Sequence, residues 1–192
     1  MGDARWSKVE RALGSYEPRR LSPTGGDRTH AAVLVPLQVV DGDVHVVYTR
    51  RAQTLPHHRG QVAFPGGTRT PADATLEDTA LREAAEEVGL RPADVRMLGR
   101  LDDIETVSSR FLITPFVGVV PHPYAWAPCP DEVDTIFTVP VSRLLDPLSE
   151  RRELWDFSGR VLPIDHFPID GQVIWGATHR ITRNLLALVE ET

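Results

Sequence analysis

Apolar and polar residues follow two periods along the chain, which predict a mixture of strands and helices. Two β-prone runs, residues 31–40 and 44–49, are separated by Asp41-Gly42-Asp43, a pattern typical of a hairpin. Residues 75–88 follow a helical period and stop at Gly89, a residue type that commonly ends helices. Further strands are expected at residues 95–101, 111–120, 135–139 and 173–175, a helical turn at 141–145 and a closing amphipathic helix at 178–188.

The N-terminal region is expected to be a short helix followed by a linker. Trp6, Val9 and Leu13 fall on one side of a helix, which predicts an amphipathic element. Residues 21–29 are rich in Pro, Gly and polar side chains, a composition typical of a loop. The region also lacks the apolar core of a secretory signal.

The order of the elements predicts the domain organisation and the fold class. We expect an N-terminal helix and linker over residues 1–30, followed by one domain over residues 31–192. Residues 121–130 must form a loop, because their prolines would interrupt a strand ladder. Strands with interspersed helices, some joined as hairpins, indicate an α+β domain with a mixed β-sheet covered by helices.

Composition narrows the class of protein. The 192 residues are 41 % hydrophobic and 25 % charged, as in ordinary globular domains, and no apolar run is long enough to span a membrane. The single Cys129 excludes an internal disulfide and fits the reducing cytoplasm. The net charge of -6 opposes binding to nucleic acid, for which a basic protein is expected. An acidic enzyme that acts on phosphates needs a divalent metal and local arginines.

Such a metal site is predicted on the helix that carries Arg82-Glu83-Ala84-Ala85-Glu86-Glu87. With 3.6 residues per turn, Glu83, Glu86 and Glu87 share one face, and hard cations such as Mg²⁺ favour oxygen ligands of this kind. Taken alone, the run is more typical of a solvated acidic face, since Glu is a common helix former. The upstream turn Gly66-Gly67 changes this interpretation. Its backbone can approach a ligand closely, and the Gly67 carbonyl could complete a metal shell.

Together these residues resemble the Nudix box. In words, the box is a glycine, five residues, a glutamate, seven residues, Arg-Glu, an apolar residue, any residue, Glu-Glu, any residue, Gly and an apolar residue. The run from Arg82 to Leu90 fits the second half if Ala84 counts as apolar. The first half departs, because the usual glutamate falls on Ala74. If Gly67 is taken as the start, Asp73 occupies the glutamate position and one extra residue follows.

Residues 47–52 (VYTRRA) and 60–67 (GQVAFPGG) resemble the signature of the coenzyme A pyrophosphatase branch of that family. The longer box is also similar to that branch. Pro56 stands where the signature has an arginine, and the nearby Arg59 lies in a different register. The similarity continues at Leu101-Asp102-Asp103, Thr114-Pro115, Asp131-Glu132-Val133 and Ile174-Trp175-Gly176-Ala177-Thr178.

The resemblance implies a Nudix-type α/β/α sandwich, a mixed sheet and a site for Mg²⁺ (or Mn²⁺). It makes Glu83, Glu86 and Glu87 metal ligands together with Gly67, and it makes Arg82 a residue that orients a glutamate through a salt bridge. The general base stays open among Glu83 and two loop residues. These loop candidates are Glu132 and Glu105.

Substrate contacts are expected around the upstream signature. Arg50 and Arg51 follow a strand and could meet a phosphate, although solvation at a sheet edge is an equal alternative. His58, with its neighbour His57, could hydrogen-bond phosphate, and the Gly66 turn could approach it. Tyr124 and Trp126 could stack on adenine, but packing of their own loop is favoured.

The implied reaction is cleavage of coenzyme A or its derivatives to 3′,5′-ADP and phosphopantetheine. The nearest alternative is another nucleotide substrate, such as NADH, ADP-ribose, a nucleotide sugar or a dNTP, and Pro56 keeps it open. A non-catalytic nucleotide-binding module is a third hypothesis, opposed by the presence of every box glutamate from Glu83 to Glu87. The small-molecule substrate leaves no role for nucleic acid or membrane, and the resemblance is compatible with a homodimer.

Overall fold

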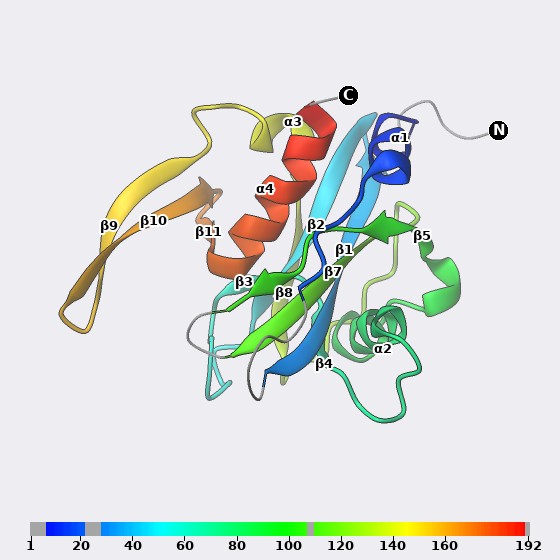
Figure 1. Ribbon diagram of the computed structural model, residues 1–192, viewed down its shortest axis with the longest axis horizontal. Helices are drawn as coiled ribbons and strands as arrows, with labels where there is room; N and C mark the ends of the chain where they lie inside the picture. The colour runs from blue at the N-terminus through cyan, green and yellow to red at the C-terminus, as the bar shows by residue number, and fades with distance from the viewer. Residues whose placement is uncertain (1–6, 22–27, 107–109, 191–192) are drawn as a thin grey trace.

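A computed structural model describes residues 7–21, 28–106 and 110–190 (Figure 1). Its helices are α1 (Ser7–Ser15), α2 (Leu76–Val88), α3 (Val141–Leu144) and α4 (Gly176–Glu190), with a 3₁₀ turn η1 (Pro92–Asp94). Its strands are β1 (Thr29–Val40), β2 (Asp43–Arg51), β3 (Val62–Ala63), β4 (Gly66–Thr68), β5 (Arg96–Arg100), β6 (Ile104–Glu105), β7 (Phe111–Val119), β8 (Val133–Pro140), β9 (Arg151–Phe157), β10 (Arg160–Ile169) and β11 (Gln172–Trp175).

The central sheet is mixed, as predicted. Its main order is β3-β2-β1-β7-β5, with β4 beside β1, β6 beside β7 and β8 beside β2. The long pair β1–β7 is parallel and the other pairs are antiparallel. The predicted hairpin between β1 and β2 is confirmed. Asp41 and Gly42 both have positive φ, which matches the right-handed twist of the two strands.

Helices cover both faces of this sheet, which confirms the predicted three-layer arrangement (Figure 1). Strand β1 shows why, because its side chains alternate between two cores. Ala32 and Leu34 pack with the apolar face of α2, whereas Val35 and Leu37 pack with residues of α1 and α4. The apolar face of α2 therefore packs on the sheet, and the helix face that carries its glutamates does not belong to this core.

The N-terminal helix is joined to the main body. Val9 and Leu13 are buried, and α1 packs against α4 and β5; Trp6 lies outside the described residues. After α1, the Tyr16 hydroxyl donates to Asp102 Oδ1 (2.5 Å), and the Leu21 N–H donates to Asp103 Oδ2 (2.9 Å). Most of the expected linker, residues 22–27, lies outside the described residues, and Thr29 already belongs to β1.

The sequence pattern did not predict strands β9 and β10. With β11 they form a separate three-stranded antiparallel sheet in the order β11-β10-β9. Figure 1 shows β9 and β10 projecting from the body as an arm beyond the start of α4. No helix in the described parts of the chain has both the length and the apolar character needed to cross a membrane.

Candidate active site

Helix α2 is held in place by local signals at both ends. Thr75 caps its first turn, and Thr75 and Asp78 exchange side-chain and backbone hydrogen bonds as a capping box. Gly89 ends the helix with φ 68°, and its N–H reaches the carbonyls of Ala84 and Ala85. The predicted helix is thus confirmed, and its acidic face is turned toward β4.

Two glutamates of α2 meet the glycine turn that precedes the helix. The Glu83 carboxylate lies so close to Gly67 that a Cβ on this glycine would be 2.5 Å from Glu83 Cδ. The Gly66 N–H donates to Glu87 Oε2 at 3.1 Å. The turn therefore lacks side chains at the place where both carboxylates approach the backbone.

Burial raises the pKa of both carboxylates. Glu87 is only 4 % exposed, and desolvation raises its pKa to about 7 against the opposing effects of the Gly66 N–H and Arg51. Desolvation also raises the pKa of Glu83, which Arg82 partly offsets. Glu86 differs, because 59 % of its side chain is exposed. The site therefore combines a buried acid (Glu87), a partly buried acid (Glu83) and a solvated acid (Glu86).

Arg82 connects the acidic side chains of the site. Its Nη2 lies 2.9 Å from Glu83 Oε1 and its Nη1 lies 3.1 Å from Glu86 Oε2. Its Nε and Nη2 donate to the two carboxylate oxygens of Asp73 at 2.9 and 3.1 Å, and Nη2 also reaches the Thr68 carbonyl. A planar guanidinium is suited to such simultaneous contacts, whereas an ammonium group is not. Arg82 thus fixes the positions of both glutamates relative to the preceding loop.

Asp73, rather than Ala74, supplies the upstream carboxylate. Asp73 is 6 % exposed, and its hydrogen bonds with Arg82 hold its pKa well below the usual range, with further help from the Thr70 N–H. Ala74 is exposed. The extra residue in the loop therefore leaves an aspartate in contact with the arginine of α2.

Arg51 and Glu132 lie beside Glu83 and Glu87. Arg51 Nη1 is 3.8 Å from Glu87 Oε1. Arg51 Nε is buried and has no hydrogen-bond partner among the residues described. The exposed Glu132 raises the pKa of both Glu83 and Glu87 through its charge, and its carbonyl accepts the Ala52 N–H at 2.9 Å. One cation and a third acid thus face the same turn.

Three other candidate residues have different contacts. Arg50 makes an ion pair with Asp134 (Nη2 to Oδ2, 2.5 Å), a partner that no sequence motif indicates. His58 is exposed and its Nδ1 lies 3.0 Å from Gln61 Oε1. Glu105, on β6, pairs with Arg28 at 3.3 Å. Glu105 is therefore held on β6 by an arginine, whereas the charge of Glu132 acts on Glu83 and Glu87.

The donor set fits a hard divalent cation in its chemistry. Glu83 and Glu87 supply carboxylate oxygens on either side of the Gly66-Gly67 turn, whose carbonyls are of the same hard type. Over residues 7–21, 28–106 and 110–190, no three His, Cys, Asp or Glu side chains converge closely enough to form a metal cluster. Glu86 is directed to Arg82 instead, and as a solvated side chain it is free to change rotamer.

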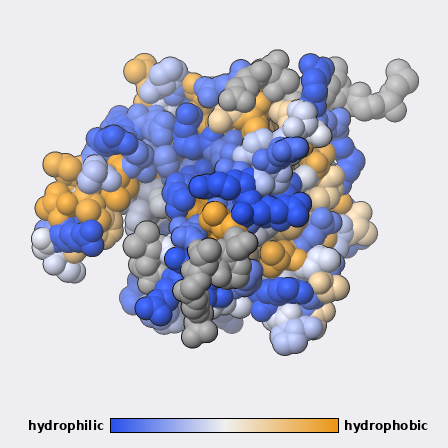
Figure 2. Space-filling view, viewed as in Figure 1, coloured by the Kyte–Doolittle hydropathy of each residue, from blue (hydrophilic) through white to orange (hydrophobic). Residues whose placement is uncertain are grey.

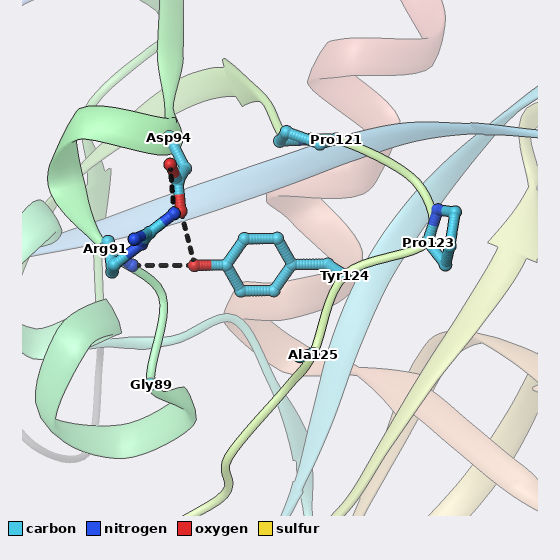
Figure 3. A pocket seen from close by; sticks show the side chains of 7 residues that line it. All are labelled: Gly89, Arg91, Asp94, Pro121, Pro123, Tyr124 and Ala125. Carbon is cyan, nitrogen blue, oxygen red and sulfur yellow. Dashed lines mark hydrogen bonds and ion pairs between the residues drawn. The ribbon is translucent and has the colours of Figure 1, made fainter.

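A separate pocket of about 400 Å³ lies beyond the end of α2 (Figure 3). The Tyr124 hydroxyl points to Arg91 and Asp94, accepting the Arg91 N–H at 3.0 Å and donating to Asp94 Oδ2 at 2.9 Å. The Tyr124 and Trp126 rings pack on each other with centroids 4.9 Å apart, and both border the core under α2. These contacts agree with packing of their own loop.

The two glycines of the turn should respond differently to alanine. A Cβ on Gly66 would lie 2.4 Å from the Ala32 carbonyl oxygen and 2.6 Å from Val33 Cα, so Gly66→Ala should lower the unfolding free energy by about 1–3 kcal/mol. On Gly67 the atoms nearest the new methyl belong to the flexible end of the Glu83 side chain. Gly67→Ala should therefore keep the melting temperature within a few degrees and lose turnover. Equal losses of stability in the two variants, measured by thermal unfolding, would contradict this.

The NUDIX domain profile matches residues 28–162 of this chain. A curated relative from Photorhabdus laumondii, called uncharacterized Nudix hydrolase NudL, is 37 % identical over 90 % of each chain. A protein of the same name from Yersinia enterocolitica is 39 % identical over 81 % of this chain and 79 % of its own. Among solved structures, a NUDIX hydrolase from Alicyclobacillus acidocaldarius superposes with a TM-score of 0.59 at 23 % identity, covering 85 % of this chain and 92 % of the other. That likeness concerns the fold.

Proposed function

We propose, from the premise that this chain belongs to the Nudix hydrolase family, that it cleaves the diphosphate of coenzyme A or its derivatives. The products are 3′,5′-ADP and phosphopantetheine or its acyl form. Family membership makes the chain a hydrolase of pyrophosphate bonds in small nucleotide compounds. We also propose that it acts in the cytoplasm, because its single Cys129 is free and suits a reducing compartment.

The observation that carries the proposal is the meeting of two sequence segments at Glu87. The upstream signature lies on both sides of this carboxylate, with Arg51 from the end of β2 and Gly66 from the start of β4. Two residues of the signature that resembles the coenzyme A branch thus contact the acidic helix at Glu87. This supports a substrate that the protein binds both at the cleaved diphosphate and at the group next to it.

Nudix hydrolases generally use divalent metals, and we propose Mg²⁺ or Mn²⁺ held by Glu83, Glu86, Glu87 and the Gly67 carbonyl. Such an ion neutralises phosphate oxygens and acidifies an attacking water. Glu86 would reach such an ion only by leaving its 3.1 Å contact with Arg82 Nη1. Arg82 keeps Asp73 and Glu83 as partners, so it continues to orient the helix face.

The other residues of the site bind and orient the substrate. Arg51 Nε has no hydrogen-bond partner within the described parts of the chain, and we assign it to a phosphate oxygen of the substrate. Glu132 accepts the proton of the attacking water, with Glu83 as the alternative base. His58, within the loop after β2, is assigned to contact the substrate beyond the diphosphate. Arg50 is assigned the same role, which requires it to leave Asp134 on the other face of β2. Gly66 is assigned a contact to the substrate through its backbone, because the position of its missing Cβ lies against β1.

A different nucleotide substrate, cleaved by the same family chemistry, is the alternative to coenzyme A. Pro56 and Arg59 are both exposed in the loop that follows β2, and Pro56 replaces the arginine of the coenzyme A signature. Loss of one cation from that loop would weaken binding of a 3′-phosphate. NADH, ADP-ribose, nucleotide sugars and dNTPs are therefore the alternative substrates, and a non-catalytic nucleotide-binding module is the last alternative.

A substrate panel tests the proposal directly. The purified chain is incubated with coenzyme A, acetyl-CoA, NADH, ADP-ribose and dNTPs in Mg²⁺ or Mn²⁺, and the products are separated by chromatography. We expect release of 3′,5′-ADP from coenzyme A or acetyl-CoA, and loss of that release in excess EDTA. Turnover confined to another compound would refute the coenzyme A assignment. Binding without turnover on the whole panel would favour the non-catalytic module.

A further inference from the structure

The arm formed by β9 and β10 has a free strand edge. In the order β11-β10-β9, strand β9 pairs only with β10 among the parts of the chain that are described. Figure 1 shows this edge projecting away from the central sheet. A free edge presents unpaired N–H and C=O groups, which makes it a template for pairing with another strand.

The arm also exposes large apolar side chains. Leu154 on β9 is 73 % exposed and Val161 on β10 is 56 % exposed. Phe157 at the end of β9 is exposed to a smaller extent. In Figure 2, hydrophobic side chains gather on the projecting arm. Small sheets of two or three strands bury little of their own apolar surface, so this one gains from a covering partner.

The backbone geometry determines which residues of β9 face the free edge. A two-residue turn, Ser158-Gly159, joins β9 to β10, and both residues have positive φ. Phe157 and Arg160 flank this turn and exchange hydrogen bonds, and the bonded pairs then alternate along the ladder. The backbone groups of Arg152, Leu154 and Asp156 therefore point outward.

The charges along β9 form a self-complementary pattern. If a second copy of β9 pairs antiparallel about a two-fold axis at Leu154, Arg152 of each copy lies opposite Asp156 of the other. The two Leu154 side chains then lie opposite each other. A register centred on Glu153 would oppose two like charges, and one centred on Arg152 would do the same. The register at Leu154 is also the one in which all of Arg151–Phe157 overlaps.

Arg152 and Asp156 each have a side-chain atom that their hydrogen bonds within the arm do not use. Arg152 uses Nε and Nη2 for Asp165, at 2.6 and 2.7 Å, and keeps Nη1. Asp156 accepts the Gly159 N–H on Oδ1 and keeps Oδ2. Three arginines balance three acids over Arg151–Ile169, so the arm is neutral in a chain with a net charge of -6. Charge repulsion between two copies therefore does not oppose self-association at this neutral arm.

We propose that β9 pairs antiparallel with β9 of a second copy of this chain, about a two-fold axis at Leu154. The two three-stranded sheets then form one six-stranded sheet, and the contact is the same surface on both copies. This dimer covers Leu154 and the β9 edge and leaves the glutamates of α2 outside the contact.

Sedimentation velocity and light scattering across a concentration series test the proposal. The wild-type chain is expected at about twice the 21.3 kDa mass of one copy. Leu154→Pro removes an outward N–H without touching the β9–β10 ladder, and Leu154→Asp places two acids opposite each other at the axis. Both variants should sediment as monomers with an unchanged melting profile at low concentration.

Leu148→Asp is the matched control, because Leu148 is 85 % exposed but lies before the arm. It should leave the dimer intact. A wild-type monomer throughout the series would overturn the proposal, and so would a dimer that survives both Leu154 substitutions. Turnover on the substrate panel is measured in parallel, since the proposed function does not depend on the dimer.

Discussion

Replacing Glu87 with Gln is expected to lower kcat by about two to three orders of magnitude while the fold persists. Metal-assisted stabilisation of phosphate charge contributes several kcal/mol, and each 1.36 kcal/mol corresponds to a tenfold change in rate. Gln has nearly the same shape, and its amide oxygen can still accept the Gly66 N–H. It carries no negative charge for a cation. Because the side chain is 4 % exposed, a neutral amide is also easier to bury, so the melting temperature should not fall.

The same substitution elsewhere on α2 supplies the control. Glu77→Gln changes an exposed glutamate in the first turn and should leave kcat close to that of the wild type. Glu86→Gln should resemble Glu87→Gln if the solvated Glu86 turns from Arg82 to the metal. Near-normal turnover in both Glu86→Gln and Glu87→Gln would refute the metal assignment.

Helix α2 was predictable because its signals act over a few residues. The capping box of Thr75 and Asp78 and the left-handed stop at Gly89 depend only on local backbone and short side chains. The β1–β2 hairpin was predictable for the same reason, since an Asp-Gly pair favours the turn that its strands require. The acidic face opposite the apolar stripe then follows from the helical period alone.

The arm could not be predicted by the same reasoning. Strand β9 carries charged residues toward both of its faces and buries neither face in the core, so no alternation marks it. It is a strand because β10 pairs with it across the two-residue turn Ser158-Gly159, with contacts such as Arg152–Asp165. Cross-strand pairing rather than burial of one face stabilises β9, so its sequence shows no alternation of apolar and polar residues.

Two details of the site also depended on the folded chain. Sequence spacing left Asp73 and Ala74 as alternatives, and only the path of the loop turns Asp73 inward. Arg50 and Arg51 were treated alike, although neighbours on a strand point to opposite faces. That alternation was the signal that could have separated Arg51, beside Glu87, from Arg50, beside Asp134.

Asp73→Asn is expected to lower kcat by about 10–100-fold with little change in KM, the usual loss when a residue that orients metal ligands is replaced. The asparagine NH2 group would face an N–H donor of Arg82, so one of the two hydrogen bonds that position the guanidinium would be lost. Arg82 would then no longer orient Glu83 and Glu86. Ala74→Glu should not restore activity, because Ala74 points to solvent. Asp94→Asn is the matched control: Asp94 binds Arg91 through the same two nitrogens, but beside Tyr124. Steady-state kinetics test this prediction. Equal kcat values in Asp73→Asn and Asp94→Asn would show that Asp73 stabilises its loop and does not position Arg82 for catalysis.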